Sequence, residues 1–368
     1  KLGVKVGEPE LDFAASNVWK AGVVKQLTQG VAGLFKANGV EWVKGAGRFT
    51  DPHTIAVEGG EAITFEHAVV ATGSVPMRPP IPGLDSALCV DSTGLLAQES
   101  VPARLVILGG GIIGSEFASI FQRFGSEVTI VELLPRLIPS EDDEVAAELA
   151  KQFRQRGISV NLEARCDRVE ERGGRLTVAY NGDQTVECDL MLVATGRAPL
   201  VDGIGLVEAG VTFDERAGIE TDEHRRTTVP HIYAVGDVAG YWQLAHTAFR
   251  EGEVAAENAC GHEAVVDNRG VPRPIYTDPE IAGVGLTEAQ AREQYGDEVA
   301  VGTFPFAANG RALMQNETVG WVKSIHETRY GELLGLVMIG PHVTDLIEAG
   351  VVALDAEATV ETVADGMA

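Results

Sequence analysis

The sequence is poor in cysteine and contains no long apolar run, and both shortages exclude classes of protein. Only four cysteines occur in 368 residues, with neither the spacing of a disulfide framework nor that of a metal site. They are Cys89, Cys166, Cys188 and Cys260. We expect each to be a small buried residue in a reducing compartment, which favours a cytoplasmic protein without a bound metal. No apolar run approaches the ~18 residues that a membrane span requires, so we expect a soluble protein.

Basic residues are also scarce. The chain has 29 lysines and arginines against 54 aspartates and glutamates, which gives a net charge of −25. Because no basic stripe is available to contact phosphate backbones, nucleic acid is not an expected partner. The acidity is typical of a solvated surface, and adaptation to a salty environment is the alternative. The length is sufficient for two or three domains with cores of their own.

One continuous stretch, residues 104–132, predicts a complete dinucleotide-binding unit. An apolar strand, RLVIL, leads into Gly109-x-Gly111-x-x-Gly114, and residues 115–124 then follow helical spacing. A second strand, EVTIV, ends at Glu132. The first glycine allows a tight turn, the second lets the backbone approach a pyrophosphate, and the third lets helix and strand pack closely. A plain glycine-rich turn is the alternative, but it does not explain strand, glycines, helix and acid in register.

The acid at the end of the second strand indicates the cofactor. The helix N-terminus presents free N–H groups and positive dipole charge to the phosphates. Glu132 can accept hydrogen bonds from both ribose hydroxyls, and its charge opposes a 2′-phosphate, so the site favours NAD over NADP. Arg136 lies close enough in the sequence to weaken this preference.

A short repeat suggests a second domain of the same design. The strand HAVVATG ends in Ala71-Thr72-Gly73, and the strand VECDLMLVATG ends in Ala194-Thr195-Gly196. Two similar strand ends suggest two nucleotide-binding domains, although coincidence of a common tripeptide is the alternative. A helical pattern over residues 13–39, of the sort that packs on one face, precedes the first of these strands.

The expected organisation is α/β, with two Rossmann-like domains and a C-terminal α+β domain. A proline-rich crossing near residues 79–82 separates a first domain, residues 1–80 and 207–271, from a second, residues 81–206. Residues 272–368 form a compact domain around an antiparallel sheet, of a kind that often makes a symmetric dimer contact.

Asp237 is the acid of interest in the returning part of the first domain. It follows the strand HIYAV, and ligands in such sheets bind beyond the carboxyl ends of strands, so Asp237 is placed to bind a polyol. A helix N-cap is the alternative role, and the two are compatible. A helix is predicted from Gln243 onward, in which Glu251 and Glu253 favour an early-helix electrostatic setting.

Several of these motifs together carry a family resemblance. In order along the chain they are ATG, GGGIIGSE, VATGR-x-P, YAVGD, LAHTAFREG, YTDPE, FPFAANGRA and ETVADGMA. The chain resembles the flavin-dependent pyridine nucleotide-disulfide oxidoreductases, and within them the dihydrolipoamide dehydrogenases. The resemblance covers essentially all 368 residues.

The resemblance implies specific roles for individual residues. It places Glu116 beside the nicotinamide, Asp237 at the flavin ribityl chain, and Ala245 and His246 as backbone neighbours of the flavin. The NAD contacts that it implies are Gly109, Gly110, Gly111, Ile112, Ile113, Gly114, Glu116, Glu132, Ala194, Thr195, Gly196 and Arg197. The FAD contacts that it implies are Gly47, Thr72, Gly73, Gly236, Asp237, Ala245 and His246.

Two parts of the family pattern are not present in this sequence. The family's own GxGxxG for FAD with a CxxxxC redox pair, and its closing His-Pro segment with a nearby Glu, have no counterpart here. We therefore expect an internal fragment of the enzyme, in which no residue serves as the redox centre. The resemblance implies oxidation of dihydrolipoamide through a disulfide, FAD and NAD⁺, in a homodimer that serves the lipoyl domain of a 2-oxo acid dehydrogenase complex.

Two other functions remain open from the sequence. A sister reductase of the mercuric reductase, glutathione reductase or soluble transhydrogenase type has the same skeleton, although Glu132 disfavours the NADP-dependent glutathione type. The second alternative is a non-catalytic NAD-binding module.

Overall fold

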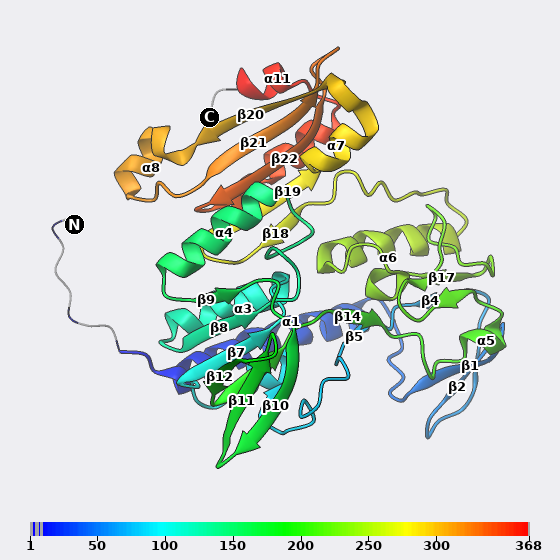
Figure 1. Cartoon of the computed structure of the whole chain (residues 1–368). Coiled ribbons are helices and arrows are strands. Elements are labelled where there is room, and N and C mark those ends of the chain that lie inside the picture. The colour runs from blue at the N-terminus through cyan, green and yellow to red at the C-terminus, as the bar shows by residue number, and fades with distance from the viewer. Residues whose placement is uncertain (1–2, 4–6, 8–9, 367–368) are drawn as a thin grey trace.

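The structure is a computed structural model that describes residue 3, residue 7 and residues 10–366. Three bodies are visible in Figure 1: a central domain that contains the glycine-rich turn, a second body formed by two separate parts of the chain, and a C-terminal sheet with its helices. The α/β class with a C-terminal α+β domain is confirmed.

The central domain is built on a parallel sheet of five strands. The strand order is β6-β13-β7-β8-β9, so β7 lies in the middle with β8 and β13 on its two sides. The bounds are β6 Cys89–Val90, β7 Arg104–Leu108, β8 Glu127–Val131, β9 Ser159–Asn161 and β13 Leu190–Val193. Its helices are α2 Ser92–Leu96, α3 Ile112–Arg123 and α4 Asp143–Gln155. An antiparallel sheet packs beside it, with β10 Cys166–Arg172, β11 Arg175–Tyr180 and β12 Gln184–Cys188.

The single strand predicted at VECDLMLVATG is two strands. β12 ends at Cys188 and β13 begins at Leu190 in a different sheet. Between them, the Asp189 carboxylate accepts hydrogen bonds from the backbone N–H of Arg104 at 2.9 Å and from its guanidinium at 3.0 Å. These bonds anchor the corner at the start of β7.

The second body combines residues before and after the central domain. Its parallel pair is β4 Ala68–Val70 with β17 Ile232–Ala234, two strands that are more than 160 residues apart in the sequence. Around this pair lie β1 Gly47–Asp51, β2 Thr54–Val57 and β3 Ile63–Thr64, the hairpin β15 Phe213–Asp214 with β16 Gly218–Ile219, and α5 Leu206–Ala209. The short 3₁₀ turn η1 Gly236–Ala239 and the helix α6 Ala245–Ala259 complete it.

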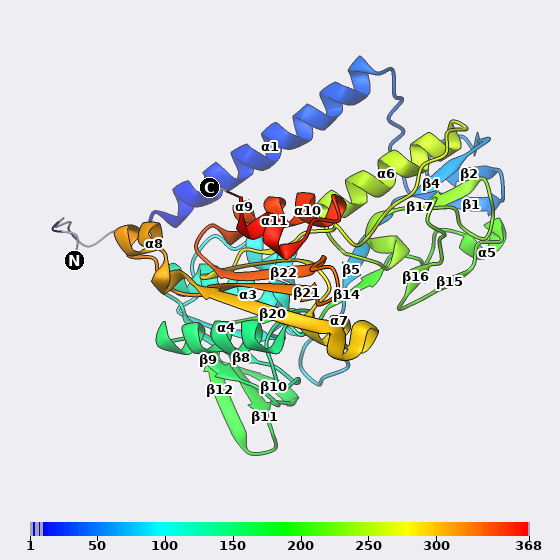
Figure 2. The same ribbon diagram turned by 90° about the horizontal axis from the view of Figure 1, so that it is seen from above.

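The C-terminal domain is an antiparallel sheet of five strands in the order β18-β19-β22-β21-β20. The strands are β18 Arg273–Ile275, β19 Glu280–Gly285, β20 Val299–Pro305, β21 Trp321–Glu327 and β22 Leu333–Gly340. The helical segments are α7 Glu288–Tyr295, η2 Gly296–Glu298, η3 Phe306–Ala308, α8 Gly310–Gln315, α9 Val343–Leu346, α10 Glu348–Asp355 and α11 Val360–Ala364. The helices after β22 cover one face of the sheet (Figure 2).

The central and C-terminal domains share one hydrophobic core. Ile275, Ile281, Val337 and Ile339 of the C-terminal sheet belong to the same buried cluster as the apolar residues of α3 and α4. Helix α4 lies between the two sheets in Figure 1. The C-terminal domain is therefore fixed directly against the helices of the nucleotide-binding unit.

The N-terminal helix differs most from expectation. Helix α1, Phe13–Ala37, forms as predicted and ends near the predicted residue, but none of its residues is buried. Figure 2 shows it as a long rod at the edge of the molecule. Trp19 is 76% exposed, whereas Asn17 donates a hydrogen bond of 3.0 Å to the carbonyl of Gln98 and the Phe13 ring packs edge-on against that of Phe124. One face therefore packs against the chain only in the first two turns, where Phe13, Asn17 and Lys20 are half-buried, and residues 21–37 are exposed, contrary to the expectation for them.

Three of the four cysteines are buried, as expected. Cys89, Cys166 and Cys188 lie in the same core cluster of the central domain, and burial raises the pKa of Cys89 and Cys166 to about 11 and that of Cys188 to about 12. Cys260 is exposed, which contradicts the expectation for that residue. Among the described residues, no three metal-binding side chains form a cluster, and no helix is long and apolar enough to cross a membrane.

Candidate nucleotide-binding site

The glycine turn has the geometry that its spacing predicts. Gly109 has φ 106°, and a Cβ there would lie 2.3 Å from the carbonyl oxygen of Ala194, so only glycine allows this turn. A Cβ on Gly114 would lie 2.0 Å from the carbonyl oxygen of Gly109, because α3 packs closely on the end of β7. Gly111 faces open space and is the N-cap of α3 without a side-chain capping bond. This arrangement leaves the helix N-terminus open to an anion.

Glu132 closes the turn from the neighbouring strand. Its Oε2 accepts a hydrogen bond of 2.5 Å from the Gly110 N–H, and its Oε1 accepts one of 2.6 Å from the Leu134 N–H. The side chain is only 7% exposed. Each carboxylate oxygen retains lone-pair capacity for a ribose hydroxyl. Glu132 is therefore also a structural support of the turn, a role that the sequence did not indicate.

Arg136, which could have favoured a 2′-phosphate, is engaged elsewhere. Its guanidinium contacts the Asp143 carboxylate and donates a hydrogen bond of 3.0 Å to the carbonyl of Pro139. These contacts hold Arg136 at the start of α4. Arg136 therefore weakens the preference for NAD over NADP less than its place in the sequence suggested.

Glu116 lies on α3, on the side of the C-terminal domain. Its Oε1 accepts a hydrogen bond of 2.9 Å from the backbone N–H of Tyr276, three residues beyond the start of β18. Desolvation by burial raises the pKa of Glu116 above its ordinary value, and the Tyr276 hydrogen bond opposes part of that rise. The ionised form of Glu116 is therefore less favourable for the stability of the folded chain than the neutral form.

The two Ala-Thr-Gly repeats meet at the crossing between the domains. β5, Ser74–Pro76, pairs antiparallel with β14, Arg197–Pro199. The Thr72 hydroxyl donates to the carbonyl of Leu200 at 2.8 Å, and the Thr195 hydroxyl donates to that of Met77 at 3.2 Å. The backbone matches this symmetry, with Leu200 N–H to Gly73 at 2.9 Å and Met77 N–H to Gly196 at 2.9 Å. Each repeat therefore makes the same turn and holds the strand that follows the other.

The Arg197 side chain points toward Ser74 and Asp237. Its Nε donates 2.7 Å to the Ser74 hydroxyl, and its Nη2 donates 2.7 Å to the Ser74 carbonyl. The Ser74 hydroxyl in turn contacts the Asp237 carboxylate, which lies 4.0 Å from the Arg197 Nε. The side chain of a residue predicted on the NAD side is thus joined to a residue predicted on the FAD side.

A buried ion pair supports the turn that carries Asp237. Glu251 is 1% exposed, and its Oε2 accepts a hydrogen bond of 2.6 Å from the Gly236 N–H. Its Oε1 accepts one of 3.0 Å from Arg225, which is itself 2% exposed. Because α6 begins at Ala245, Glu251 lies mid-helix, and its expected early-helix role is wrong. Sequence reasoning missed Arg225 and Ser74 altogether, since nothing local marks them.

The remaining predicted FAD residues are distributed over the second body. Ala245 and His246 are exposed at the start of α6, which has no side-chain N-cap, and a ring nitrogen of His246 lies 2.8 Å from the carbonyl of Pro272. Gly47 is the first residue of β1, in the outer antiparallel sheet.

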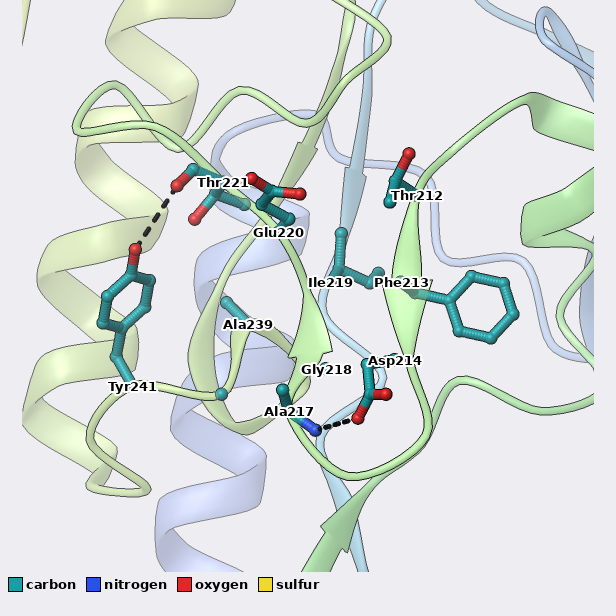
Figure 3. A pocket seen from close by; sticks show the side chains of 11 residues that line it. Thr212, Phe213, Asp214, Ala217, Gly218, Ile219, Glu220, Thr221, Ala239 and Tyr241 are labelled. Carbon is teal, nitrogen blue, oxygen red and sulfur yellow. Dashed lines mark hydrogen bonds between the residues drawn. The ribbon is translucent and has the colours of Figure 1, made fainter.

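A cavity of about 390 Å³ lies beside the hairpin β15–β16 (Figure 3). The Asp214 carboxylate accepts a hydrogen bond of 2.8 Å from the Ala217 N–H, and the Tyr241 hydroxyl donates one of 3.3 Å to the Thr221 carbonyl, both drawn as dashed lines in Figure 3. None of the predicted site residues lines this cavity. It does border η1, because Ala239 of that turn is among its lining residues.

Comparison with known proteins agrees with this geometry. Residues 4–252 match the family model described as pyridine nucleotide-disulphide oxidoreductase, and residues 271–368 match its dimerisation domain. A dihydrolipoyl dehydrogenase of Thermus scotoductus is 43% identical over 98% of this chain and 78% of its own length. A dihydrolipoyl dehydrogenase of Bacillus subtilis is 40% identical over 98% of this chain and 79% of its own length. The solved HOCl-induced flavoprotein disulfide reductase of Escherichia coli superimposes with a TM-score of 0.90 at 31% identity, over 97% of this chain and 83% of its own.

Proposed function

The chain belongs to the pyridine nucleotide-disulphide oxidoreductase family, and on that premise we propose that it oxidises dihydrolipoamide to lipoamide with reduction of NAD⁺ through FAD. The observation that carries the NAD half is the open helix N-terminus at Gly111 with Glu132 held against the turn. The substrate follows from the curated relatives, which are dihydrolipoyl dehydrogenases. None of these relatives favours the sister reductases or a non-catalytic module.

We propose the following roles for the NAD-side residues. The backbone N–H groups at the start of α3 bind the pyrophosphate, the Glu132 carboxylate binds the adenosine ribose, and Glu116 lies beside the nicotinamide. Residues 109–114, 116, 132 and 194–197 form the site, with the Arg197 side chain directed to its neighbour on the FAD side. When bound, FAD and NAD supply the redox chemistry, and the chain supplies binding, orientation and protection from water.

The FAD-side proposal depends on Asp237. Its carboxylate is partly exposed beyond the end of β17 and is oriented by Ser74, which suits an acceptor for the ribityl hydroxyls. The other proposed contacts are Gly47, Thr72, Gly73, Gly236, Ala245 and His246. We assign no residue of this chain as the redox centre, because the pKa of each buried cysteine is raised and these thiols stay protonated at neutral pH.

The proposed organisation follows the same division as the sequence suggested. Residues 1–80 and 207–271 form the FAD-binding domain, residues 81–206 the NAD-binding domain, and residues 272–368 the dimerisation domain of a homodimer. Exposed apolar side chains of the last domain, among them Met314 at 76% and Val352 at 59%, are consistent with a contact between copies. The lipoyl domain of a 2-oxo acid dehydrogenase complex is the proposed partner, in the cytoplasm.

The test is reduction of NAD⁺ by dihydrolipoamide, followed at 340 nm with added FAD, in a protein that carries both this chain and the family's CxxxxC redox pair. We expect turnover with NAD⁺ and much less with NADP⁺. Turnover that is equal with both nucleotides would contradict the role of Glu132. If the protein with the redox pair binds NADH and FAD but does not oxidise dihydrolipoamide, the proposed substrate is contradicted and the cofactor sites are not.

A further inference from the structure

We propose that the ion pair between Glu141 and Arg273, which links the central domain to the C-terminal domain, sets the position of the glycine turn. Arg273 is then a positioning residue for NAD, although it lies in another domain and does not touch the nucleotide site. The inference rests on the proposed NAD site at the turn.

The pair is buried and leaves little freedom of movement. The Arg273 Nε lies 2.9 Å from Glu141 Oε1 and its Nη2 lies 3.3 Å from Oε2, while Nη1 donates 3.0 Å to the carbonyl of Gly285. The side chains are 7% and 1% exposed. Gly283 makes room for them, because a Cβ there would lie 2.7 Å from the Arg273 Nη2 and 2.8 Å from the Glu141 Oε2. The planar fork of arginine fits this two-point contact.

The loop before Glu141 carries this anchor to the glycine turn. The Glu141 N–H donates 3.1 Å to the carbonyl of Ile138, and the Ile138 N–H donates 3.0 Å to the carbonyl of Gly110. The Leu137 side chain also packs closely against Gly110, where a Cβ would lie 2.5 Å from the Leu137 Cδ2. A displacement of the loop would therefore move the backbone that faces the pyrophosphate.

Ile138 is the reason that the loop needs an anchor. It has φ 44°, a left-handed conformation that a β-branched residue rarely adopts, and its side chain is fully buried. Such strained residues persist where the surrounding structure over-determines them. The ion pair three residues later supplies that constraint from the other domain.

A second cation of the C-terminal domain holds the following residues. Lys323 is 2% exposed, with its Nζ 2.6 Å from Glu288 Oε2, 3.7 Å from Asp142 Oδ2 and in contact with Glu144. Asp142 also accepts a hydrogen bond of 3.0 Å from the Glu288 N–H at the start of α7. The acidic run 141–144 is therefore held at successive points by one sheet and its helix.

The experiment measures NADH dissociation constants by calorimetry at 25 °C on the full chain. It compares the parent with Arg273→Met, Glu141→Leu, Arg273→Lys and the double variant Glu141→Leu/Arg273→Met. Either single removal leaves a buried charge without a partner and takes away the anchor of the loop, so we expect about tenfold weaker NADH binding. The double variant leaves no buried charge, so we expect its affinity to return to within about threefold of the parent.

Two further variants separate positioning from a general loss of stability. Arg273→Lys keeps the charge without the fork and should bind NADH with intermediate affinity. Arg104→Met removes the ion pairs to Glu187 and Asp189 within the central domain, at the end of β7 opposite the glycine turn. This variant should have a lower melting temperature but unchanged NADH binding.

The outcomes distinguish this inference from the proposed function. A parent chain that does not bind NADH would contradict the NAD site itself. The positioning role would be overturned if the parent binds NADH and the single variants have dissociation constants within twofold of it. It would also be overturned if the double variant binds NADH no more tightly than the single variants. If Arg273→Met does not fold, Glu141→Leu and Arg273→Lys decide the question by the same comparison.

Discussion

Two alanine substitutions in the glycine turn should affect different properties, one the stability of the chain and the other its NADH binding. Gly114→Ala places a methyl 2.0 Å from the carbonyl oxygen of Gly109, where only backbone could move away. Such overpacking costs about 2–3 kcal/mol, whereas the better helix propensity of alanine returns only about 1 kcal/mol. We therefore expect a net loss of about 1–2 kcal/mol of stability, with a fall in melting temperature on the order of 2 °C.

Gly111→Ala places its methyl where the free protein has open space. Its φ is −68°, which alanine adopts readily, so the loss of cap preference and the lower entropy of the unfolded chain nearly cancel. The same methyl stands between the helix N-terminus and the proposed pyrophosphate. Loss of a charge-assisted hydrogen bond costs about 1.5–3 kcal/mol, which weakens NADH binding by about tenfold or more.

The assay is thermal unfolding of both variants together with NADH titration well below their melting temperatures. The expected result is that Gly114→Ala loses stability, whereas Gly111→Ala loses affinity for NADH. A Gly111→Ala chain that binds NADH as the parent does would refute the placement of the pyrophosphate. A Gly114→Ala chain as stable as the parent would refute the close approach of α3 to β7.

Three further predictions concern acids whose surroundings differ. Glu132→Ala should weaken NADH binding by ~1–2 kcal/mol while NADPH binding improves; equal NADH affinity in variant and parent would exclude the ribose contact. Burial raises the pKa of Glu116, so its contribution to stability is present below the unfolded pKa and is lost as pH rises through the folded value. Glu116→Gln should therefore raise the melting temperature at pH 7–8 with little effect near pH 4, and an equal effect at both would contradict this assignment. Glu251→Ala leaves the buried Arg225 without its partner and should lower stability by about 3–5 kcal/mol; denaturant unfolding checks it, and a change below about 1 kcal/mol would show that water reaches Arg225.

The sequence placed Glu132 correctly at the end of β8 and placed Glu251 wrongly near the start of α6, and the two differ for a physical reason. Glu132 ends a strand that directly follows the glycine helix, so its place is set within 23 residues of local structure. Glu251 meets Arg225 only because α6 and the segment before β17 pack together. Periodicity describes a helix but not the charged group that faces it.

The Ala-Thr-Gly repeat shows an intermediate case. The sequence indicated two strands of similar design, and both strands exist as β4 and β13. Their threonines hold each other's following strand, which no reading of either segment alone predicts. The pairing of β5 with β14 requires both domains to be folded and in place.

What the linear order of residues was sufficient to predict is the chemistry that lies within one folding unit. The strand, three glycines, helix and acid of residues 104–132 are neighbours along the chain, and steric limits on the backbone leave little choice about their arrangement. Tertiary structure alone decided the direction of the Arg197 side chain, the exposure of α1 and the partners of Glu141 and Lys323. Most of those contacts join residues more than 100 positions apart. They depend on how whole layers pack, because burial of a charge is favourable only where a distant partner meets it.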